Sequence, residues 1–442
     1  MKPNTIYQMS LRDFTGEGTL KGAMKMLSHI AELGVDTVYV SALCTEDESV
    51  SGQSPRQIKS GFQNVKNPYR IRDYFGVDEE FGSVSDLKEF VSAAHEKGLK
   101  VLIDLVYLHC GPTAVFLDEN PDFVIRNEDG TIKVGAEWPF ARLNYENKEL
   151  REHLWKNMEF FVSDIGADGF RCDVGDGVPL DFWEEGVRRV KQINPDVYML
   201  NEGSDRKILS VFDSLYLHEA IFLLNHTFAY MPHSGKKAKH IIAENDETKY
   251  TLSFFKEQWQ ALHEGVPAGA ALCNSENHDT VTDCFEERPE RFLGADGYEA
   301  VLALLYTLDG TPMLYNGNEI ADSGLKSLFW NRFCKGSYAV QWENALTITG
   351  KRRLALLKRL IALRKEMPAL QSGERAWTDN GCADAVLSFT RGEEVKVYVN
   401  VTAYPQKDVL STKPFDSVVL SQGADINGGA LRLAPYGFLI AK

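Results

Sequence analysis

Short apolar runs alternate with amphipathic segments along most of this 442-residue chain. Runs with the character of β-strands lie at residues 5–9, 36–40, 100–108, 167–173, 197–202, 270–276 and 311–317. Between several of them the apolar positions recur with a helical period, which predicts helices near residues 19–33, 83–97, 148–163 and 180–193. Strands that alternate with helices in this way build right-handed βαβ units around a parallel sheet.

The repeats favour a closed barrel over an open sheet. About eight strand–helix repeats are the content of a (β/α)8 TIM barrel, although this chain would carry insertions. The sequence has no GxGxxG loop after a strand, which argues against an open nucleotide-binding sheet. We therefore expect a protein of the α/β class built on a TIM barrel.

Two regions depart from the alternation. Residues 110–146, after the third predicted strand, are rich in Asp, Asn, Pro and Gly and are expected to form a short inserted subdomain. From residue 369 onward strand-like runs alternate with turns, which predicts a C-terminal antiparallel β-domain at residues 369–442. The barrel itself is then expected to comprise residues 1–109 and 147–368.

Composition and charge limit the class of partner. Hydrophobic residues make up 44% of the chain and charged residues 25%, which is typical of a globular protein. The net charge is −15 at pH 7 and no block of Lys or Arg interrupts it. We therefore expect no nucleic acid and no membrane surface as partner, and a neutral substrate instead.

The cysteines and the first residues indicate a compartment. The seven Cys are scattered, with neither a CxxC motif nor a Cys/His metal spacing, which is typical of reduced thiols. The first ten residues, MKPNTIYQMS, lack the apolar stretch of a signal peptide, and no segment approaches the roughly 20 apolar residues of a membrane span. The expectation is a cytoplasmic protein.

Charged side chains stand where the predicted strands end, which is where a barrel carries its working residues. They are Asp104 and His109 after the third strand, Arg171 and Asp173 on the fourth, Glu202 on the fifth, and Glu276, His278 and Asp279 after the seventh. Arg171 and Asp173 are two positions apart, so they share one face of their strand. A guanidinium in that position favours the ionised form of the carboxylate.

Three carboxylates from different strands suggest glycoside hydrolysis. That reaction needs one ionised carboxylate beside the anomeric carbon and one protonated acid at the leaving oxygen. A two-metal hydrolase is the alternative, but it needs more His or bridging carboxylates at close spacing than these strands offer.

Four short motifs carry a resemblance to the α-amylase family of glycoside hydrolases. DLVYLH (104–109), GFRCD (169–173), MLNEGS (199–204) and NHD (277–279) resemble that family's four signature regions, in the family's order. Each motif is weak alone, whereas the ordered set with an inserted loop after the third strand is specific. The similarity extends over most of the chain.

The resemblance implies a role for each matching residue. Asp173 would be the nucleophile, Glu202 the acid/base, and Asp279 the carboxylate that holds ring hydroxyls in the transition state. The remaining substrate-contacting or site-forming positions are Tyr69, His109, Arg171 and His278. Tyr69 follows Pro68, where the family has Gly, so its stacking on the sugar is less firmly implied.

Structural roles compete with several of these assignments. The two histidines could be satisfied core residues, Tyr69 could be a packing residue, and Asp104 is expected to orient its neighbours. Trp138, Trp183 and Trp342 are expected in the core rather than as sugar platforms.

Two departures from the family pattern argue against its structural calcium. Leu108 stands where the family has a calcium-binding Asn, and Arg142 is aligned with an Asp ligand of the inserted subdomain. Calcium takes six to eight oxygen ligands, so we expect no metal site and no cofactor, with the Arg142 guanidinium tying the insertion to the barrel instead. A third departure, Asp176-Gly177 in place of a common Lys-His pair, predicts different binding on the leaving-group side.

The function expected from the sequence is a retaining hydrolase of α-glucosidic bonds, most simply the α-1,4 bonds of maltooligosaccharides. An exo-acting α-glucosidase or a transglycosylase would use the same three carboxylates, and the sequence does not separate them. A catalytically silent glucan-binding relative is a further alternative, although such relatives usually lose a carboxylate.

Overall fold

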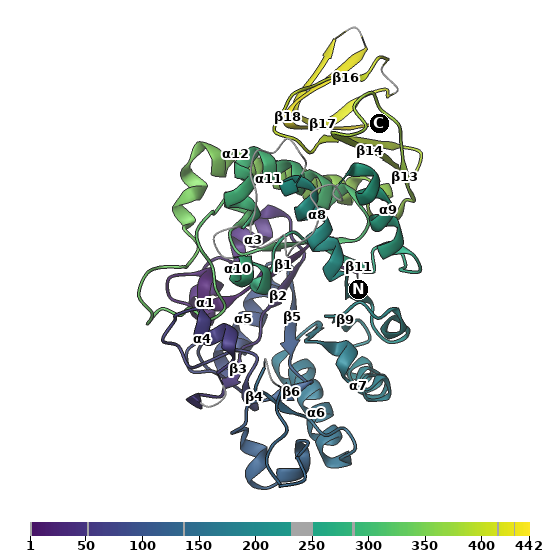
Figure 1. The fold of residues 1–442 in the computed structure, drawn as a ribbon. Helices are drawn as coiled ribbons and strands as arrows, with labels where there is room; N and C mark the ends of the chain where they lie inside the picture. Colours follow the sequence, from purple (N-terminus) through teal and green to yellow (C-terminus); the bar gives the residue numbers. More distant parts are fainter. Residues whose placement is uncertain are drawn as a thin grey trace. The chain divides into compact units, whose positions relative to one another are not determined.

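Eight parallel strands form a closed barrel in this computed structural model, which describes residues 2–50, 53–135, 138–230, 251–284, 288–412, 415–427 and 429–442 (Figure 1). The barrel strands are β1 (Ile6–Met9), β2 (Thr37–Val40), β5 (Lys100–Leu105), β8 (Gly169–Cys172), β9 (Tyr198–Asn201), β10 (Ser214–Tyr216), β11 (Ala271–Cys273) and β12 (Thr311–Tyr315). Their order around the barrel is β1-β12-β11-β10-β9-β8-β5-β2. The predicted fold class is confirmed.

The barrel strands are short and are buried on both faces. Every residue of β1, β2, β8 and β9 is buried, as expected for parallel strands covered by helices. Seven of the eight strands coincide with apolar runs predicted from the sequence, and each strand is one to four residues shorter than its run. The sixth, β10, was not located from the pattern, because three residues are too few to show a period.

Helices follow the barrel strands as the sequence period predicts. They are α2 (Leu20–Met24), α3 (Leu27–Leu33), α5 (Val84–Glu96), α6 (Lys148–Phe160), α7 (Leu180–Ile193), α8 (His218–Tyr230), α9 (Leu252–His263), α10 (His278–Cys284), α11 (Pro289–Thr307) and α12 (Ile348–Glu366). The range of α7 is the predicted one, whereas the single helix expected at 19–33 is divided into α2 and α3. Ser83 and Asp86 form a capping box that sets the start of α5.

The chain divides into two compact units, which comprise residues 1–216 with 326–340, and residues 217–325 with 341–442. The predicted insertion, residues 110–146, lies in the first unit and is entered through β6 (His109–Cys110), which pairs with β7 (Ala141–Arg142) in antiparallel register. The predicted C-terminal domain lies in the second unit. Its proposed boundaries remain a prediction.

The end of the second unit is an antiparallel sheet, drawn in yellow in Figure 1. Its strands are β13 (Arg375–Trp377), β14 (Val386–Arg391), β15 (Val395–Asn400), β16 (Gln406–Leu410), β17 (Val418–Asn427) and β18 (Ala430–Ala441). One face buries a cluster that includes Val386, Val409 and Leu439. The short helix α13 (Ala369–Ser372) precedes the sheet, so the helical pattern continues for four residues past the expected start of the C-terminal domain.

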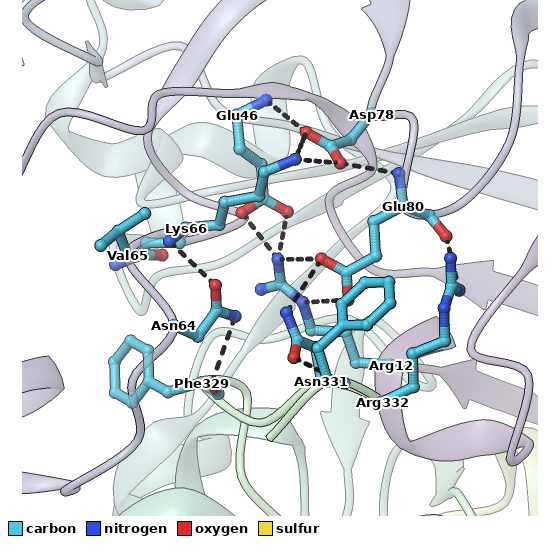
Figure 2. Close-up of polar contacts among 12 residues, drawn as sticks. Arg12, Glu46, Asn64, Val65, Lys66, Asp78, Glu80, Phe329, Asn331 and Arg332 are labelled. Atoms are coloured by element: carbon cyan, nitrogen blue, oxygen red, sulfur yellow. Dashed lines mark hydrogen bonds and ion pairs between the residues drawn. The ribbon is translucent and has the colours of Figure 1, made fainter.

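A buried charge cluster holds residues 326–340 to the N-terminal part of the first unit, as Figure 2 shows. Arg12, in the short helix α1 (Leu11–Phe14), lies 2.8 Å from a Glu46 oxygen in β3 (Cys44–Glu46) and 3.2 Å from a Glu80 oxygen. The guanidinium also donates to the Leu328 carbonyl at 3.1 Å. The Asn331 amide donates to Glu80 at 3.4 Å, so two acidic residues and one arginine fix the returning segment.

Two further findings concern the described residues alone. None of their helices is long and apolar enough to cross a membrane. Six cysteines whose surroundings the structure describes are free thiols, and the side chain of the seventh, Cys284, lies outside that description.

Candidate active site

Arg171 lies at the centre of a cluster of acidic side chains at the end of β8. Its Nη1 donates to Asp104 Oδ1 at 2.7 Å and to Asp173 Oδ1 at 3.0 Å. Its Nη2 lies 2.7 Å from Glu202 Oε1. The structure therefore brings together the Arg171, Asp173 and Glu202 that the sequence singled out.

The strand register explains why these side chains meet. Asp104 on β5 pairs with Arg171 on β8, and Cys172 on β8 pairs with Asn201 on β9. The ladder continues one residue further, since the Asp173 amide donates to the Leu105 carbonyl at 2.8 Å. The Glu202 amide donates in the same way to Cys172 at 2.9 Å. Asp173 and Glu202 consequently occupy equivalent positions at the ends of adjacent strands.

Arg171 is a permanent buried cation. Burial opposes its charge, but the carboxylates of Asp104 and Glu202 outweigh burial and raise the pKa of Arg171 well above its usual value. The guanidinium lies 5.8 Å from the ring centre of Tyr39 and 5.7 Å from those of Tyr69 and Tyr216, distances at which aromatic faces attract a cation.

Asp104 accepts hydrogen bonds from three side chains. Tyr39 and Tyr69 donate their hydroxyls to Oδ2 at 2.7 Å and 2.9 Å, while Arg171 occupies Oδ1. The Tyr69 side chain is therefore held by its hydroxyl with only 8% of the residue exposed. Asp104 therefore orients Tyr39, Tyr69 and Arg171, and its bond to the Tyr69 hydroxyl fixes the position of the Tyr69 ring.

His109 is a neutral imidazole in a defined tautomer. Its Nε2 lies 2.9 Å from the Tyr69 carbonyl, and because a carbonyl can only accept, Nε2 carries the proton. Burial lowers the pKa of His109 to about 4, and the positive charge of Arg142 acts in the same direction. The ring packs against Phe140 at 4.5 Å between ring centres.

The second oxygen of Glu202 is held by the backbone. The Val174 amide donates to Glu202 Oε2 at 2.9 Å. Val174 adopts a φ of 41°, in the left-handed region that β-branched residues rarely occupy. A strained residue next to Asp173 thus presents a donor to Glu202, and this contact could not be read from the sequence.

In the second unit, the NHD motif forms the start of α10. The Asn277 side chain accepts from the amides of Asp279 and Thr280 at 3.0 and 2.8 Å, which caps the helix. His278 is buried with Nε2 3.2 Å from Asp279 Oδ2, whereas the Asp279 side chain is 35% exposed. Asp279 is therefore positioned by its neighbours and still accessible.

Glu276, the other acidic residue of this segment, is fully engaged. Arg288 contacts its two oxygens at 2.9 and 3.1 Å, and Asn318 donates to it at 2.8 Å. A buried carboxylate paired in this way stabilises the second unit.

The three tryptophans differ in their burial. Trp183 is completely buried, stacks on Tyr107 and donates to the Gly175 carbonyl at 3.1 Å, so it has the expected core position beneath the loop after β8. Trp138 is 36% exposed and packs against Phe140. Trp342 is partly exposed, so neither of these two lies fully in the core.

The sequence reasoning missed Tyr39, Tyr216 and Asn201. Tyr39 stands one residue before the end of β2, so a search of strand ends for aromatic residues would have found it. Tyr216 ends β10, a strand that was not predicted, so the same search would have missed it. Asn201 precedes Glu202 and faces the loop after β8. Within the described part of the chain, no group of three or more His, Cys, Asp or Glu side chains could hold a metal ion.

A closed parallel barrel with paired carboxylates at adjacent strand ends is the architecture of a large class of hydrolases. The family model for the alpha-amylase catalytic domain matches residues 5–127 and 138–352. The chain belongs to the alpha-amylase family of glycoside hydrolases.

Named relatives fall within the same family. The chain is 28% identical over 392 residues to a cyclomaltodextrinase of a Bacillus species, covering 80% of this chain and 60% of that protein. It is 25% identical over 439 residues to a maltogenic alpha-amylase of Bacillus acidopullulyticus, covering 90% and 65%. The chain therefore spans less than two thirds of the length of these relatives.

Solved structures share the fold over the whole chain. A maltogenic alpha-amylase from Thermotoga neapolitana has a TM-score of 0.76 at 21% identity, covering 99% of this chain and 97% of that one. An alpha-amylase from Lactobacillus plantarum has a TM-score of 0.78 at 21% identity, covering 99% of both chains. At this identity the likeness establishes the architecture.

Proposed function

We propose that this protein is a retaining glycoside hydrolase that cleaves α-glucosidic bonds, with α-1,4-linked maltooligosaccharides as substrate. The observation that carries the proposal is the single guanidinium of Arg171 in contact with both Asp173 and Glu202. Retaining enzymes keep their two carboxyl groups about 5–5.5 Å apart, and inverting enzymes about 6.5–9.5 Å. Two carboxylates that share one guanidinium favour the shorter separation.

Each residue then has a defined task. Asp173, ionised beside Arg171, attacks the anomeric carbon while Glu202 gives its proton to the leaving oxygen, so the glycosidic bond breaks and a glycosyl ester of Asp173 forms. Glu202, now a carboxylate, takes a proton from water. That water attacks the anomeric carbon, Asp173 departs as a carboxylate and Glu202 is protonated again.

The remaining residues are proposed to bind the sugar, as the family resemblance implies. His278 would donate to a sugar hydroxyl, Tyr69 would pack on the ring, and Asp279 would hold ring hydroxyls more strongly in the transition state. The resemblance also makes His109 a donor to the sugar, but its one N–H is given to the Tyr69 carbonyl, so His109 would instead accept from a sugar hydroxyl at Nδ1. The neutral His109 suits an uncharged sugar.

The relatives support an α-glucan without fixing the linkage. They include a cyclomaltodextrinase, a maltogenic alpha-amylase and an oligo-1,6-glucosidase. We propose α-1,4 bonds because two of these three names refer to maltose units or their cyclic polymers. Exo action and transfer to another sugar remain the alternatives.

The residues present do not fit a family calcium site. Leu108 offers no side-chain oxygen, and the Arg142 guanidinium donates from Nη2 to the Gly177 carbonyl at 3.1 Å. A cation at this point would meet the Arg142 charge. We propose that the contact between β7 and the loop after β8 takes the place of an ion, and that catalysis needs no cofactor.

Chromatography of the products from maltoheptaose tests the proposed function, with the Asp173→Asn protein run beside the wild type. A ladder of shorter maltooligosaccharides from the wild type and none from the variant is expected. Glucose as the sole product would indicate exo action instead. Intact maltoheptaose in both samples would contradict the proposed substrate.

A further inference from the structure

We propose that Asp176 is a positioning residue for the acid/base Glu202. The inference rests on the proposed function and deepens it. The Asp176 carboxylate accepts three hydrogen bonds from the segment that carries Glu202: from Asn201 Nδ2 at 2.7 Å, from the Ser204 amide at 2.9 Å and from the Asp205 amide at 3.0 Å.

The three donors flank Glu202 on both sides in the chain. Asn201 immediately precedes it, and Ser204 and Asp205 follow within three residues, so one carboxylate holds the side chain before the acid and the backbone after it. Asp176 itself stands three residues after Asp173. We call these three hydrogen bonds of Asp176 the clamp. The clamp links the loop after β8, which follows the nucleophile Asp173, to the loop after β9, which follows the acid Glu202.

Two glycines allow these loops to approach each other. A Cβ atom on Gly203 would collide with the Asp176 carboxylate, and a Cβ atom on Gly175 would collide with the Asn201 side-chain oxygen. The separation of the loops is thus set by backbone-to-side-chain contact. Together with the Val174 amide on Glu202 Oε2, the clamp leaves the Glu202 segment little freedom.

An ordinary turn-forming aspartate would bond its own backbone two residues on. Asn201, Ser204 and Asp205, which donate to Asp176, are instead 25 to 29 positions away in the sequence. An acid that must meet the leaving oxygen within hydrogen-bond reach loses effectiveness when its backbone shifts. Removing the clamp should therefore impair proton donation more than it impairs nucleophilic attack.

The dependence of rate on the leaving group separates these two effects. We would measure kcat/KM of Asp176→Ala on 2,4-dinitrophenyl and phenyl α-maltosides, because the dinitrophenolate departs without a proton and the phenolate needs one. The expected loss is about 10–100-fold for the phenyl substrate, part of the 100-fold or more that general acid catalysis supplies, and at most about threefold for the dinitrophenyl substrate. Asp176→Asn keeps an acceptor and should retain more activity than Asp176→Ala.

Two controls make the test specific. Asp181→Ala removes an exposed aspartate of the first turn of α7 that pairs with Arg151, and should change neither rate. In a Glu202→Gln background, Asp176→Ala should cause no further loss on the phenyl substrate, because the group that it positions is gone. Equal losses on both aryl substrates, or an additive loss in the double variant, would overturn the inference.

Hydrogen exchange tests the clamp without relying on activity. In Asp176→Ala the amides of Ser204 and Asp205 lose their acceptor, so the peptide that contains them should exchange at least about tenfold faster, while the Asp181→Ala protein should match the wild type. Unchanged exchange would refute the clamp. A wild type inactive on all α-glucosides would instead refute the proposed function, with the exchange result still deciding the clamp.

Discussion

The guanidinium of Arg171 and the carboxylate of Glu202 form a buried ion pair, with Nη2 and Oε1 2.7 Å apart. Arg171 is completely buried, and its other terminal nitrogen is engaged with Asp104 and Asp173. One guanidinium therefore contacts three acidic side chains of the candidate site. Arg171, on the otherwise apolar strand β8, is what allows these acidic residues to be buried there.

Removing this cation should cost both stability and activity. Arg171→Met leaves three buried carboxylates without a countercharge, which should lower the free energy of unfolding by about 3–5 kcal/mol. Arg171→Lys keeps the charge but cannot span two carboxylates and should recover part of the loss. Urea denaturation measures both changes.

Arg189→Met is the matched control for this prediction. Arg189 also contacts several carboxylates, including Glu152 and Glu185, but at the surface. Its loss should cost about 1 kcal/mol or less. If Arg171→Met were no more destabilising than this control, the central role of Arg171 would be wrong.

His109 predicts a specific dependence of stability on pH. Its pKa is about 4 in the folded state, below its ordinary value of 6.5, so the unfolded chain binds more protons between these values. The free energy of unfolding should therefore fall as the pH decreases from about 6.5 to about 4. His109→Gln, which retains a donor for Tyr69, should lose about 2 kcal/mol less over this range.

Urea denaturation of the wild type and His109→Gln at pH 7 and pH 4.5 checks this difference. Parallel pH dependences in the two proteins would show that His109 is not held neutral by burial.

The contact between Arg142 and Gly177 predicts indifference to calcium. The melting temperature should be the same in excess calcium and in chelator, because Leu108 supplies no ligand and Arg142 is positively charged. Arg142→Ala should lower the melting temperature by a few degrees, and Arg142→Lys should restore part of it. Marked thermal stabilisation of the wild type by calcium would refute this account.

Loss of the buried charge cluster around Arg12 should loosen the segment 326–340. Arg12→Met leaves Glu46 and Glu80 buried without their main countercharge, so the protein should lose about 3–5 kcal/mol. Hydrogen exchange should increase first at residues 326–340, which this cluster holds (Figure 2). Uniform exchange throughout the first unit would argue against a local role.

Much of the barrel could be predicted because strand and helix periods differ. The helix at 180–193 shows this, since it combines a clear helical period with a clear end. The apolar run at 100–108, in contrast, continues three residues past the end of β5 at Leu105. The strand Ser214–Tyr216 was missed because its three residues carry no period. The division of 19–33 into two helices depends on tertiary packing that the sequence pattern does not contain.

The sequence named several residues that the structure brings together, but it did not predict the contacts between them. The spacing of Arg171 and Asp173 indicated that they share a face, and the structure gives them a hydrogen bond. The Val174 amide on Glu202 depends on a left-handed backbone, which a β-branched residue does not signal. The sequence marked Asp176 only as a departure from the family, because its partners lie on another loop.

The most direct test of the central claim is to trap the glycosyl ester. The protein would be incubated with 5-fluoro-α-glucosyl fluoride, digested and examined by mass spectrometry. The account predicts a glycosyl adduct on the peptide that contains Asp173, absent from Asp173→Asn. An adduct on another residue, or an active enzyme that forms no adduct and releases the inverted anomer first, would contradict it.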